Sequence, residues 1–453
     1  MASVAIIGAG PVGCLAGLGF AHKGYKVTLY DSRPDPRIIE DQSLRSINLA
    51  VSDRGINAMK YIDSEMTGRV LEGIIPMYGR MIHHLDGGQE SQKYGLFGEH
   101  INSIDRDKLN QCLITELERF NNLNPDNKVE FKFQCKFTTM HVEEDADNVV
   151  IEYYDLLKKK QTGIYDFVVG ADGCYSRVRS TLMKYIRMNY RQVYIDMCYL
   201  ELTIPPGPEG SFRIDANHLH IWPRRDFMLI ALPNGDGSFT CTFFGPWKLT
   251  ESLNTKELVE DFFKKHFSDA INLIGLGKIV IAFLNHPKSA LMHVTCSSYH
   301  YNDKCILIGD SAHSMVPFYG QGMNCGFEDV RVLLELLNKH DQSRKAAFDE
   351  YSASRHKDLV SILRLALDNY YEMSTKVQSP RYLFRKKLDN ILGRFFPDHW
   401  IPLYSMVAFR ADIPYSECIR VENRQKKLVK ILESTVLTSG LALLVVYLSK
   451  KSN

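Results

Sequence analysis

The stretch GAGPVG, residues 8–13, directly follows the apolar run Val4–Ile7 and opens a segment of apolar, helix-forming residues. A strand, a turn of the form GxGxxG and a helix in this order predict the first βαβ unit of a dinucleotide-binding domain. Gly8 permits the tight turn, Gly10 lets a pyrophosphate approach the backbone, and Gly13 permits close packing of the helix on the strand. The helix N-terminus would then offer unpaired N–H groups to the phosphates.

A second strand-like run, Lys26–Tyr30, ends at Asp31. An acidic residue at this place can accept hydrogen bonds from the ribose hydroxyls of a dinucleotide. GxGxxG alone would be weak evidence, but the two strands and the acid together make the motif specific. They do not yet separate FAD from NAD as the bound dinucleotide.

Two later strands end in short acidic motifs. The first runs into Asp172-Gly173, which taken alone is also explained by a strand, a tight turn and a helix N-cap. The second, Cys305–Ile308, runs into Gly309-Asp310, and a glycine-rich loop and a helix from about Met323 follow. Asp310 can accept a hydrogen bond from a ribityl or ribose hydroxyl, and a helix N-terminus stabilises the charge that a reduced flavin carries near N1. The second motif therefore favours FAD.

The composition is that of an ordinary globular protein, with 453 residues, 45% hydrophobic and 24% charged. This length predicts two or more subdomains. The 55 Lys and Arg nearly balance the 53 Asp and Glu, so the charge gives no broad basic surface, and we predict no nucleic-acid partner. The ten cysteines include no CxxC pair, and we predict no metal site. The oligomeric state is left open.

The pattern of apolar residues changes along the chain. We predict an α/β protein with a Rossmann-type FAD-binding fold, a second β-sheet substrate domain and a C-terminal helical region ending in a membrane anchor. Short β-rich runs at His218–Trp222, Phe227–Leu232 and Phe239–Phe244, separated by turn sequences, predict an antiparallel meander. The predicted FAD-binding segments are 1–75, 101–185 and 301–340; the substrate-domain segments are 76–100 and 186–300; the covering C-terminal helices span 341–425, and the anchor 431–449.

The three short motifs, at 8–13, 172–173 and 309–310, occur in an order that resembles the single-component FAD-dependent aromatic hydroxylases. In that family one chain binds FAD and uses NADPH and O2, without a separate Rossmann domain for the nicotinamide. This sequence fits, because it has no second strand–GxGxxG–helix unit. The longer segments that carry the resemblance are Arg45–Ala50, Gly79–His83, Val316–Asn324, Asp368–Tyr370 and Pro402–Tyr404.

Within that family the resemblance is closest to members that hydroxylate the amino acid L-kynurenine at ring carbon C3, a step of tryptophan catabolism and NAD synthesis. It implies hydride transfer from NADPH to FAD, a flavin C4a-hydroperoxide formed with O2, and attack on the carbon ortho to the ring amine. That amine already activates the carbon, so we predict no dedicated catalytic acid or base. The protein would position the substrate and exclude water.

The resemblance also assigns site residues. Arg80 matches a carboxylate-binding arginine, in keeping with the two parallel hydrogen bonds a guanidinium can make, and Tyr94 matches a tyrosine that donates to the same carboxylate. Without the resemblance, Arg80 would be taken for a surface ion-pair partner and Tyr94 for a core aromatic. The predicted substrate-binding residues are Arg80, Tyr94, Phe318, Gln321, Asn369 and Tyr404. The predicted FAD-binding residues are Gly8, Gly10, Val12, Gly13, Asp31, Arg33, Arg45, Ala50, Arg106, Asp172, Asp310, Gly322, Met323 and Asn324.

The C-terminal stretch STVLTSGLALLVVYLS, residues 434–449, has no charged residue and is flanked by lysines on both sides. A bilayer span needs about 20 apolar residues, so this run is a marginal candidate, and the alternative is a buried helix. We favour a membrane anchor, because basic residues at both ends can reach the headgroups. The tail is similar to those of outer mitochondrial membrane proteins, which implies a catalytic part facing the cytosol.

Two other functions are compatible with parts of this sequence. An FAD monooxygenase or epoxidase acting on another aromatic or lipid substrate would share the flavin motifs, although Arg80 favours an anionic substrate. A binding module that resembles the Rab GDP-dissociation inhibitors would share the Rossmann-type fold without a flavin. The complete Gly-Asp loop at 309–310 argues against that module.

Overall fold

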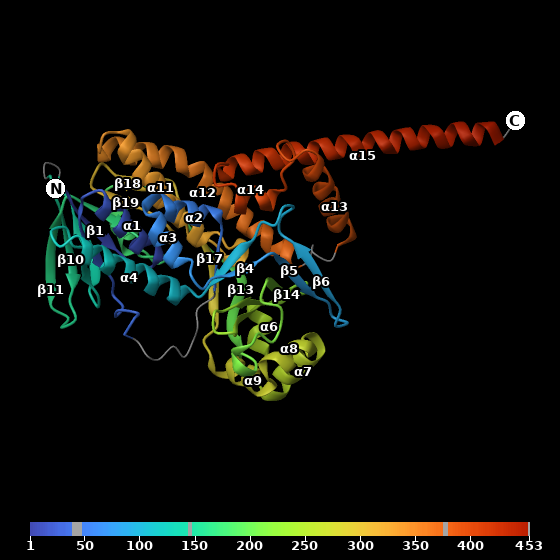
Figure 1. Cartoon of the computed structure of the whole chain (residues 1–453), viewed down its shortest axis with the longest axis horizontal. Coiled ribbons are helices and arrows are strands. Elements are labelled where there is room, and N and C mark those ends of the chain that lie inside the picture. Colours follow the sequence, from blue (N-terminus) through green and yellow to red (C-terminus); the bar gives the residue numbers. More distant parts are fainter. Residues whose placement is uncertain (39–47, 144–146, 375–378, 452–453) are drawn as a thin grey trace.

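The computed structural model describes residues 1–38, 48–143, 147–374 and 379–451, with the backbone alone for Arg381, Glu433 and residues 436–451. Figure 1 shows a nucleotide-fold part that contains the N-terminus and a second β-sheet part beside it. The long helices α12 (Arg344–Ser374) and α15 (Tyr415–Lys451) run along one edge of both parts. The predicted residue Arg45 lies outside the described residues.

The nucleotide-fold part is built on a six-stranded sheet with β1 near its centre. β1 pairs in parallel with β2 and β12, and four of its five residues are buried, as expected for a strand covered on both faces. The predicted strand–turn–helix unit is therefore confirmed. In order across the sheet the strands are β18 (His300–Tyr301), β19 (Cys305–Leu307), β12 (Phe167–Gly170), β1 (Ser3–Ile7), β2 (Lys26–Tyr30) and β8 (Glu130–Lys132).

The turn between β1 and α1 requires glycine at two positions, because a side chain there would collide with the backbone. Gly8 has a φ of +106°, and a Cβ on it would lie 2.4 Å from the carbonyl oxygen of Ala171. A Cβ on Gly13 would lie 1.8 Å from the carbonyl oxygen of Gly8. Any side chain at either position would push α1 (Pro11–His22) away from the strands. The close approach of this helix to the sheet is thus fixed by residues 8 and 13.

The second part contains a seven-stranded sheet that draws on distant segments of the chain. β14, β15 and β16 form antiparallel neighbours, which confirms the predicted meander. β5 pairs in parallel with β14 and antiparallel with β6, which brings Arg80 into this sheet. In order the strands are β17 (Ser289–Cys296), β13 (Tyr190–Ile204), β16 (Phe239–Gly245), β15 (Phe227–Pro233), β14 (His218–Arg224), β5 (Gly79–His83) and β6 (Gln89–Lys93).

Two smaller sheets and the remaining helices complete the fold. The antiparallel β9 (Lys136–His141), β10 (Val149–Tyr154) and β11 (Lys160–Tyr165) form one three-stranded sheet, and β3 (Leu49–Val51), β7 (Ile101–Ile104) and β4 (Ile75–Met77) form another. The other helices are α2 (Asp53–Ile62), α3 (Ser64–Val70), α4 (Arg106–Leu123), α5 (Arg177–Leu182), α6 (Trp247–Ser252), α7 (Lys256–His266), α8 (Ser268–Ile274), α9 (Leu276–Asn285), α10 (Asp310–His313), α11 (Gly322–Lys339), α13 (Pro380–Phe395) and α14 (Leu403–Phe409).

The core is divided in the same way as the sheets. One large cluster of buried apolar side chains runs through the nucleotide-fold part and under α11 and α12. A second cluster, which includes Trp222, Phe243, Phe263 and Phe283, fills the space between the seven-stranded sheet and α7 to α9. The first cluster includes Phe244 of β16 and Phe318, which lie beside each other at the junction of the two parts.

Among the residues whose side chains are described, no single helix is long and apolar enough to cross a bilayer. The pair α8 and α9 passes such a test only when the two are taken together across a 90° bend. The predicted anchor at 431–449 lies largely outside the described side chains, although α15 continues through it as a helix.

Candidate active site

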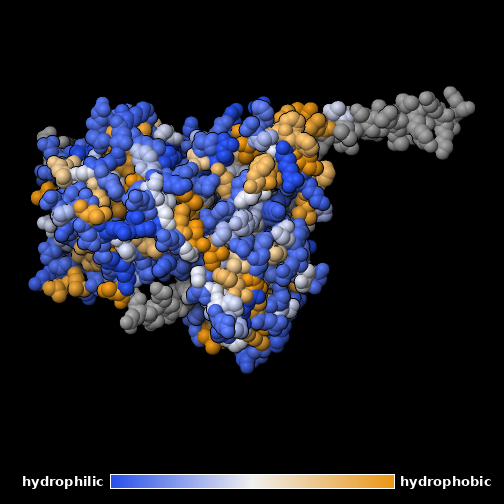
Figure 2. Space-filling model, in the orientation of Figure 1, coloured by the Kyte–Doolittle hydropathy of each residue, from blue (hydrophilic) through white to orange (hydrophobic). Residues whose placement is uncertain are grey.

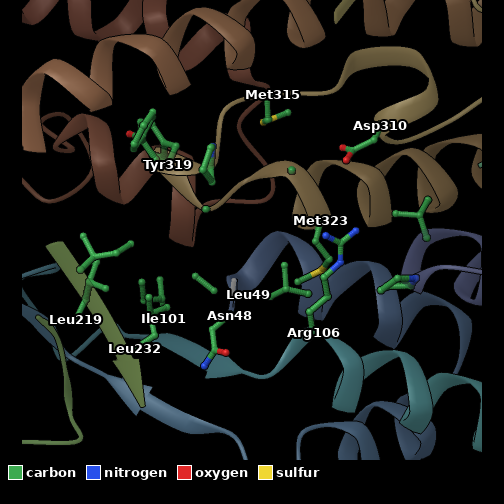
Figure 3. Close-up of a pocket in the computed structure, with 18 of the residues that line it drawn as sticks. Asn48, Leu49, Ile101, Arg106, Leu219, Leu232, Asp310, Met315, Tyr319 and Met323 are labelled. Atoms are coloured by element: carbon green, nitrogen blue, oxygen red, sulfur yellow. The ribbon is translucent and has the colours of Figure 1, made fainter. Parts of the chain in front are cut away.

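A cavity lies where the two parts of the molecule meet. Gly10 and Val12 come from the start of α1, Gly322 and Met323 from the start of α11, and residues of the seven-stranded sheet form the opposite wall. Figure 3 shows Asp310, Arg106 and Met323 at one side of this cavity, and Tyr319, Leu219, Leu232 and Ile101 at the other. The cavity therefore has a polar side next to two helix N-termini and a side lined mainly by apolar and aromatic residues.

Both of these helices begin without a side-chain cap. The N-cap positions are Gly10 for α1 and Gln321 for α11, and neither side chain accepts a hydrogen bond from the first turn. The free N–H groups and the partial positive charge at each N-terminus thus face the cavity. Such ends suit the pyrophosphate of a dinucleotide at α1 and the reduced form of a flavin ring at α11.

The backbone also leaves room for a flat ligand beside these helices. A Cβ built on Gly10 or on Gly173 would meet no atom within 4 Å, and both glycines line the cavity. A Cβ on Gly322 would lie 3.7 Å from the Met315 side chain and 3.9 Å from the carboxylate of Asp310. A side chain at these positions would occupy space that now borders the cavity. The residues present therefore fit FAD. Asp310 and Arg106 both line the cavity, and their contacts with a ribityl hydroxyl and with phosphate stay predictions.

The side chain of Asn324 links the start of α11 to two other backbone segments beside the cavity. Its side-chain amide donates to the carbonyl oxygens of Ala50 and Gly320, both at 2.7 Å, and its Oδ1 accepts from the N–H of Ser52 at 2.9 Å. The side chain is completely buried. Asn324 therefore positions the backbone around the cavity without lining it.

Arg80 lies at the other end of the cavity and is almost completely buried. Its Nη1 donates to Glu372 at 2.9 Å, and the hydroxyl of Tyr382 donates to the same carboxylate oxygen at 2.9 Å. The guanidinium faces the rings of Tyr94 and Tyr404, which are themselves stacked with centroids 4.8 Å apart. Burial alone would lower the pKa of Arg80, but Glu372 and the surrounding tyrosines raise it, so the guanidinium stays charged.

Two polar atoms of this cluster make no hydrogen bond of normal geometry within the described part of the chain. They are Nε of Arg80 and the hydroxyl of Tyr94, and both are buried. A buried donor without a partner costs about 1–3 kcal/mol. Both residues line the cavity, so an anionic group bound there could accept from both. This pair of unpartnered donors is the strongest single indication of a ligand in the structure.

Eleven of the twenty predicted site residues line this cavity, although they come from segments throughout the chain. These residues are Gly10, Val12, Ala50, Arg80, Tyr94, Arg106, Asp310, Phe318, Gly322, Met323 and Tyr404. The structure thus brings together the predicted flavin motifs and the predicted carboxylate pair in one place.

The acidic residues of the first two motifs have protein partners of their own. Asp31 accepts from the N–H of Ala9 at 2.9 Å and forms a two-pronged ion pair with Arg33. Asp172 accepts from Ser176 and from backbone N–H groups at the start of α5. Neither carboxylate lines the cavity. Their predicted contacts with FAD stay predictions. The helix N-cap expected after Asp172-Gly173 is Ser176, whose hydroxyl accepts from the N–H of Arg179 at 2.9 Å.

Two predicted substrate contacts also point elsewhere in this structure. Gln321 accepts from the hydroxyl of Tyr415 at 3.0 Å and is buried. Asn369 donates to the carbonyl oxygen of Phe318 at 2.7 Å and is buried as well. Both side chains support the loop that carries Phe318 and Tyr319. Direct contact of either with a substrate stays a prediction.

Glu372 and Tyr319 lie in the site but are not among the residues that the sequence predicts for it. Glu372 lies one helical turn after Asn369 on α12, and that spacing could have indicated a shared helix face. Its pairing with Arg80 could not be inferred, because it depends on how α12 crosses β5. Tyr319 stacks on Tyr404 with centroids 5.6 Å apart and lines the cavity. The loop sequence Val316–Asn324 contains Tyr319, but nothing local distinguishes it as a site residue.

Comparisons with known proteins agree with this geometry. The family model of the FAD binding domain matches residues 1–365. Among solved structures, a 2-methyl-3-hydroxypyridine-5-carboxylic acid oxygenase has a TM-score of 0.65 at 15% identity, covering 84% of this chain and 95% of that one. HpxO of Klebsiella pneumoniae, solved with FAD, has a TM-score of 0.61 at 16% identity, covering 86% of this chain and 94% of that one. The family match and the shared fold define an FAD-binding protein with the aromatic hydroxylase fold.

The curated relatives narrow this class further. Kynurenine 3-monooxygenase of Candida albicans is 52% identical over 94% of this chain and 92% of its own length. The protein of that name from Debaryomyces hansenii is 51% identical, covering 99% of this chain and 97% of its own length. That of Saccharomyces cerevisiae is 49% identical, covering 96% of this chain and 95% of its own length. The chain belongs to the kynurenine 3-monooxygenase family.

Proposed function

We propose that this protein hydroxylates L-kynurenine at ring carbon C3, with FAD as its cofactor and NADPH and O2 as co-substrates. The observation that carries the proposal is the pair of unpartnered donors on Arg80 and Tyr94, in the cavity that the uncapped ends of α1 and α11 also face. Membership of a family whose relatives bear the name kynurenine 3-monooxygenase supports the choice of substrate.

The amino-acid end of kynurenine carries a carboxylate and an ammonium group on one carbon. The carboxylate would accept from Arg80 Nε and the Tyr94 hydroxyl. Glu372 lies 2.9 Å from the same guanidinium and can accept from the neighbouring ammonium group. Adjacent positive and negative side chains thus match adjacent charges on the substrate, which a purely anionic or apolar ligand would leave partly unpaired.

The aromatic end of the substrate would lie against the apolar wall formed by Leu219, Ile230, Leu232, Phe244 and Phe318. These side chains orient the ring and keep water from the reacting carbon. Bound FAD supplies the chemistry, as acceptor of hydride from NADPH and activator of O2. The chain has to hold the ring carbon ortho to the amine next to the flavin end of the cavity. It needs no acid or base of its own, because the amine activates that carbon.

The direct test uses the purified full-length protein in detergent. We expect a flavin absorption spectrum, NADPH oxidation that rises strongly when L-kynurenine is added, and a matching amount of 3-hydroxykynurenine. A panel of other aromatic and lipid substrates serves as the control. NADPH oxidation without product would mean that kynurenine only triggers wasteful peroxide formation. A yellow protein indifferent to kynurenine would exclude the proposed substrate.

The pH dependence of substrate binding offers a second test. Lys386 of α13 donates to Gln92 at 3.2 Å, and burial, followed by the nearby charge of Arg80, lowers its pKa to about 8. The amine is therefore charged below pH 8 and neutral above it. Losing this charge weakens the positive potential around the carboxylate site, so KM for L-kynurenine should rise roughly three- to tenfold between pH 7 and pH 9. The Lys386→Gln variant should lack this rise, and an identical profile in both proteins would contradict the assignment.

The proposal extends to where the protein acts. The uncharged run at 434–449, flanked by lysines, would anchor the chain in a membrane, with the cavity on the cytosolic side of the outer mitochondrial membrane. Support comes from the sequence pattern. Fractionation of cells that express a tagged full-length chain, with protease added to intact mitochondria, tests both location and orientation. Release of the protein by high salt alone would argue against an anchor.

A further inference from the structure

Helix α13 has its polar side turned toward the protein. Tyr382 donates to Glu372, Lys386 donates to Gln92 of β6, and Asp389 accepts from Arg385 and from the indole N–H of Trp400. A helix on the surface of a water-soluble domain normally turns its apolar stripe toward the core. In α13 the inward face is the one that carries hydrogen bonds and ion pairs.

The outward face of α13 is apolar. Phe384, Ile391 and Phe395 have exposed fractions of 64%, 54% and 76%. Their spacing of seven and four residues places them on one side of the helix. The exposed Lys387 and Arg394 flank this stripe. The helix is thus amphipathic, but its polar face packs on the protein, and its large apolar side chains are exposed beside basic residues.

A second exposed apolar group lies on α15, just before the uncharged run. Leu428, Ile431 and Leu432 are 44%, 62% and 58% exposed, and Lys427 and Lys430 are exposed among them. The two helices are neighbours, since the Glu422 carboxylate of α15 interacts electrostatically with Arg385 and Asp389 of α13. Figure 1 shows α13 crosswise to α15 at the end of the body from which α15 extends, and Figure 2 shows apolar side chains gathered there.

We propose that the outward faces of α13 and of residues 428–432 form one docking surface for the interface of an anionic lipid bilayer. This inference rests on the membrane part of the proposed function and adds a second contact to the tail. The tail alone is marginal, because its uncharged run has 16 residues where a span needs about 20. Exposed aromatic and branched side chains beside lysine and arginine are the composition that binds in the headgroup region.

The charges on this surface favour lipid over a second copy of the chain. A symmetric dimer would bring Lys387, Arg394, Lys427 and Lys430 of one copy close to the same residues of the other. An anionic bilayer instead pairs each of them with a phosphate or carboxylate group. Docking would also hold α13 in place from outside, and α13 carries Tyr382, which fixes the Glu372 partner of Arg80.

The test places a single new tryptophan in the full-length protein reconstituted into vesicles of phosphatidylcholine and phosphatidylserine. Phe395→Trp reports on α13, Leu443→Trp reports on the tail, and Leu157→Trp, an exposed site in the β10–β11 hairpin, is the matched control. The emission of the unmodified protein, with its three native tryptophans, is subtracted. We expect the added emission of Phe395→Trp to shift to shorter wavelength and to lose most of its intensity when the lipids are brominated near the headgroup.

Each outcome separates the two membrane contacts. Quenching of Phe395→Trp but not of Leu157→Trp supports the docking surface. Quenching of Leu443→Trp alone would overturn it and leave the anchor intact. Quenching of neither variant, whether the lipids are brominated near the headgroup or deep in the acyl chains, would overturn both proposals. A blue shift of Phe395→Trp in detergent, without vesicles and with a doubled molecular mass, would assign the surface to a second copy of the chain and also overturn it.

Discussion

Replacement of Arg80 by Met should lower kcat/KM for L-kynurenine by roughly a hundredfold or more. Truncating one partner of a buried, charge-assisted contact costs about 2–5 kcal/mol, and 1.4 kcal/mol is a factor of ten. Methionine keeps much of the stem of Arg80 but removes the guanidinium that faces Tyr94 and Tyr404. Initial rates of NADPH oxidation and of product formation, measured over a wide range of kynurenine concentrations, provide the check.

The substrate supplies a matched control for this variant. Kynuramine has the same ring and chain but lacks the carboxylate, so it cannot use Arg80 Nε or the Tyr94 hydroxyl in the proposed way. We expect the unmodified protein to bind it poorly, and Arg80→Met to change its kcat/KM by much less than it changes that for kynurenine. An equal loss for both substrates would mean that the variant perturbs the site in general. An unchanged KM for kynurenine would contradict the assignment of Arg80.

Two further variants separate charge from geometry. Arg80→Lys keeps a positive charge near Glu372 but has no planar guanidinium. Its kcat/KM for kynurenine should therefore lie between those of the unmodified protein and of Arg80→Met. Tyr94→Phe removes one of the unpartnered donors and should raise KM by roughly tenfold, since a hydrogen bond to a charged group contributes about 1.5–3 kcal/mol. Flavin content and melting temperature should stay nearly unchanged in Tyr94→Phe, because this hydroxyl makes no hydrogen bond of normal geometry among the described residues.

Local motifs explain why the flavin side of the site could be predicted from the sequence. Residues 8–13 carry much of their own geometry: Gly13 is required by a contact at 1.8 Å with Gly8, and Gly8 by its φ of +106°. The start of α11 at Gly322 likewise follows from the glycine-rich loop before it. The meander of β14 to β16 follows from alternating apolar runs and turn sequences. The helical region expected over 341–425 contains α12, α13, α14 and the start of α15.

The substrate side depends on contacts between distant segments, which local patterns do not encode. Arg80 and Glu372 lie 292 positions apart and meet only because β5 adds in parallel to β14 and α12 crosses above it. Arg33 pairs with Asp31 only two positions away, and its predicted contact with FAD stays a prediction. Spacing indicates which residues share a face of an element, but the element packed against that face decides their partners.

The second large effect is expected at Arg355, where Arg355→Met should lower the free energy of unfolding by about 3–5 kcal/mol. Arg355 of α12 pairs with Glu328 at 2.8 Å and with Asp329 at 2.7 Å, both on α11, and all three are nearly fully buried. Removing one partner of a buried ion pair is costly, because it leaves an uncompensated charge in a region of low dielectric. The loss would reach the flavin side as well, since Asp329 also accepts from the N–H of Gly309.

Arg364→Met on the same helix is the matched control. Arg364 is 74% exposed on its side chain and lies 3.8 Å from Asp368, one turn away. Exposed pairs of this kind contribute about 0–1 kcal/mol, so urea unfolding of this variant should nearly coincide with that of the unmodified protein. Release of flavin fluorescence on heating, followed in parallel, should occur at a lower temperature for Arg355→Met only. Equal melting curves for the two variants would show that the buried network contributes little.

The dependence of the free energy of unfolding on pH, at acidic pH, tests the same network of Arg355, Glu328 and Asp329 independently. Burial alone would raise the pKa of Asp329, but His313 and Arg355 lower it from 3.8 to about 2. The folded state thus binds the Asp329 proton more weakly than the unfolded chain does. Its contribution to stability is complete above pH 4 and is lost as the pH falls toward 2. In Arg355→Met the pKa of Asp329 should rise, so part of this pH-dependent loss should disappear.

A double variant, Arg355→Met with Asp329→Asn, should be less destabilised than the sum of its two single changes, because it no longer buries that charge unpaired. Strict additivity of the three unfolding free energies would contradict the coupling on which this prediction depends.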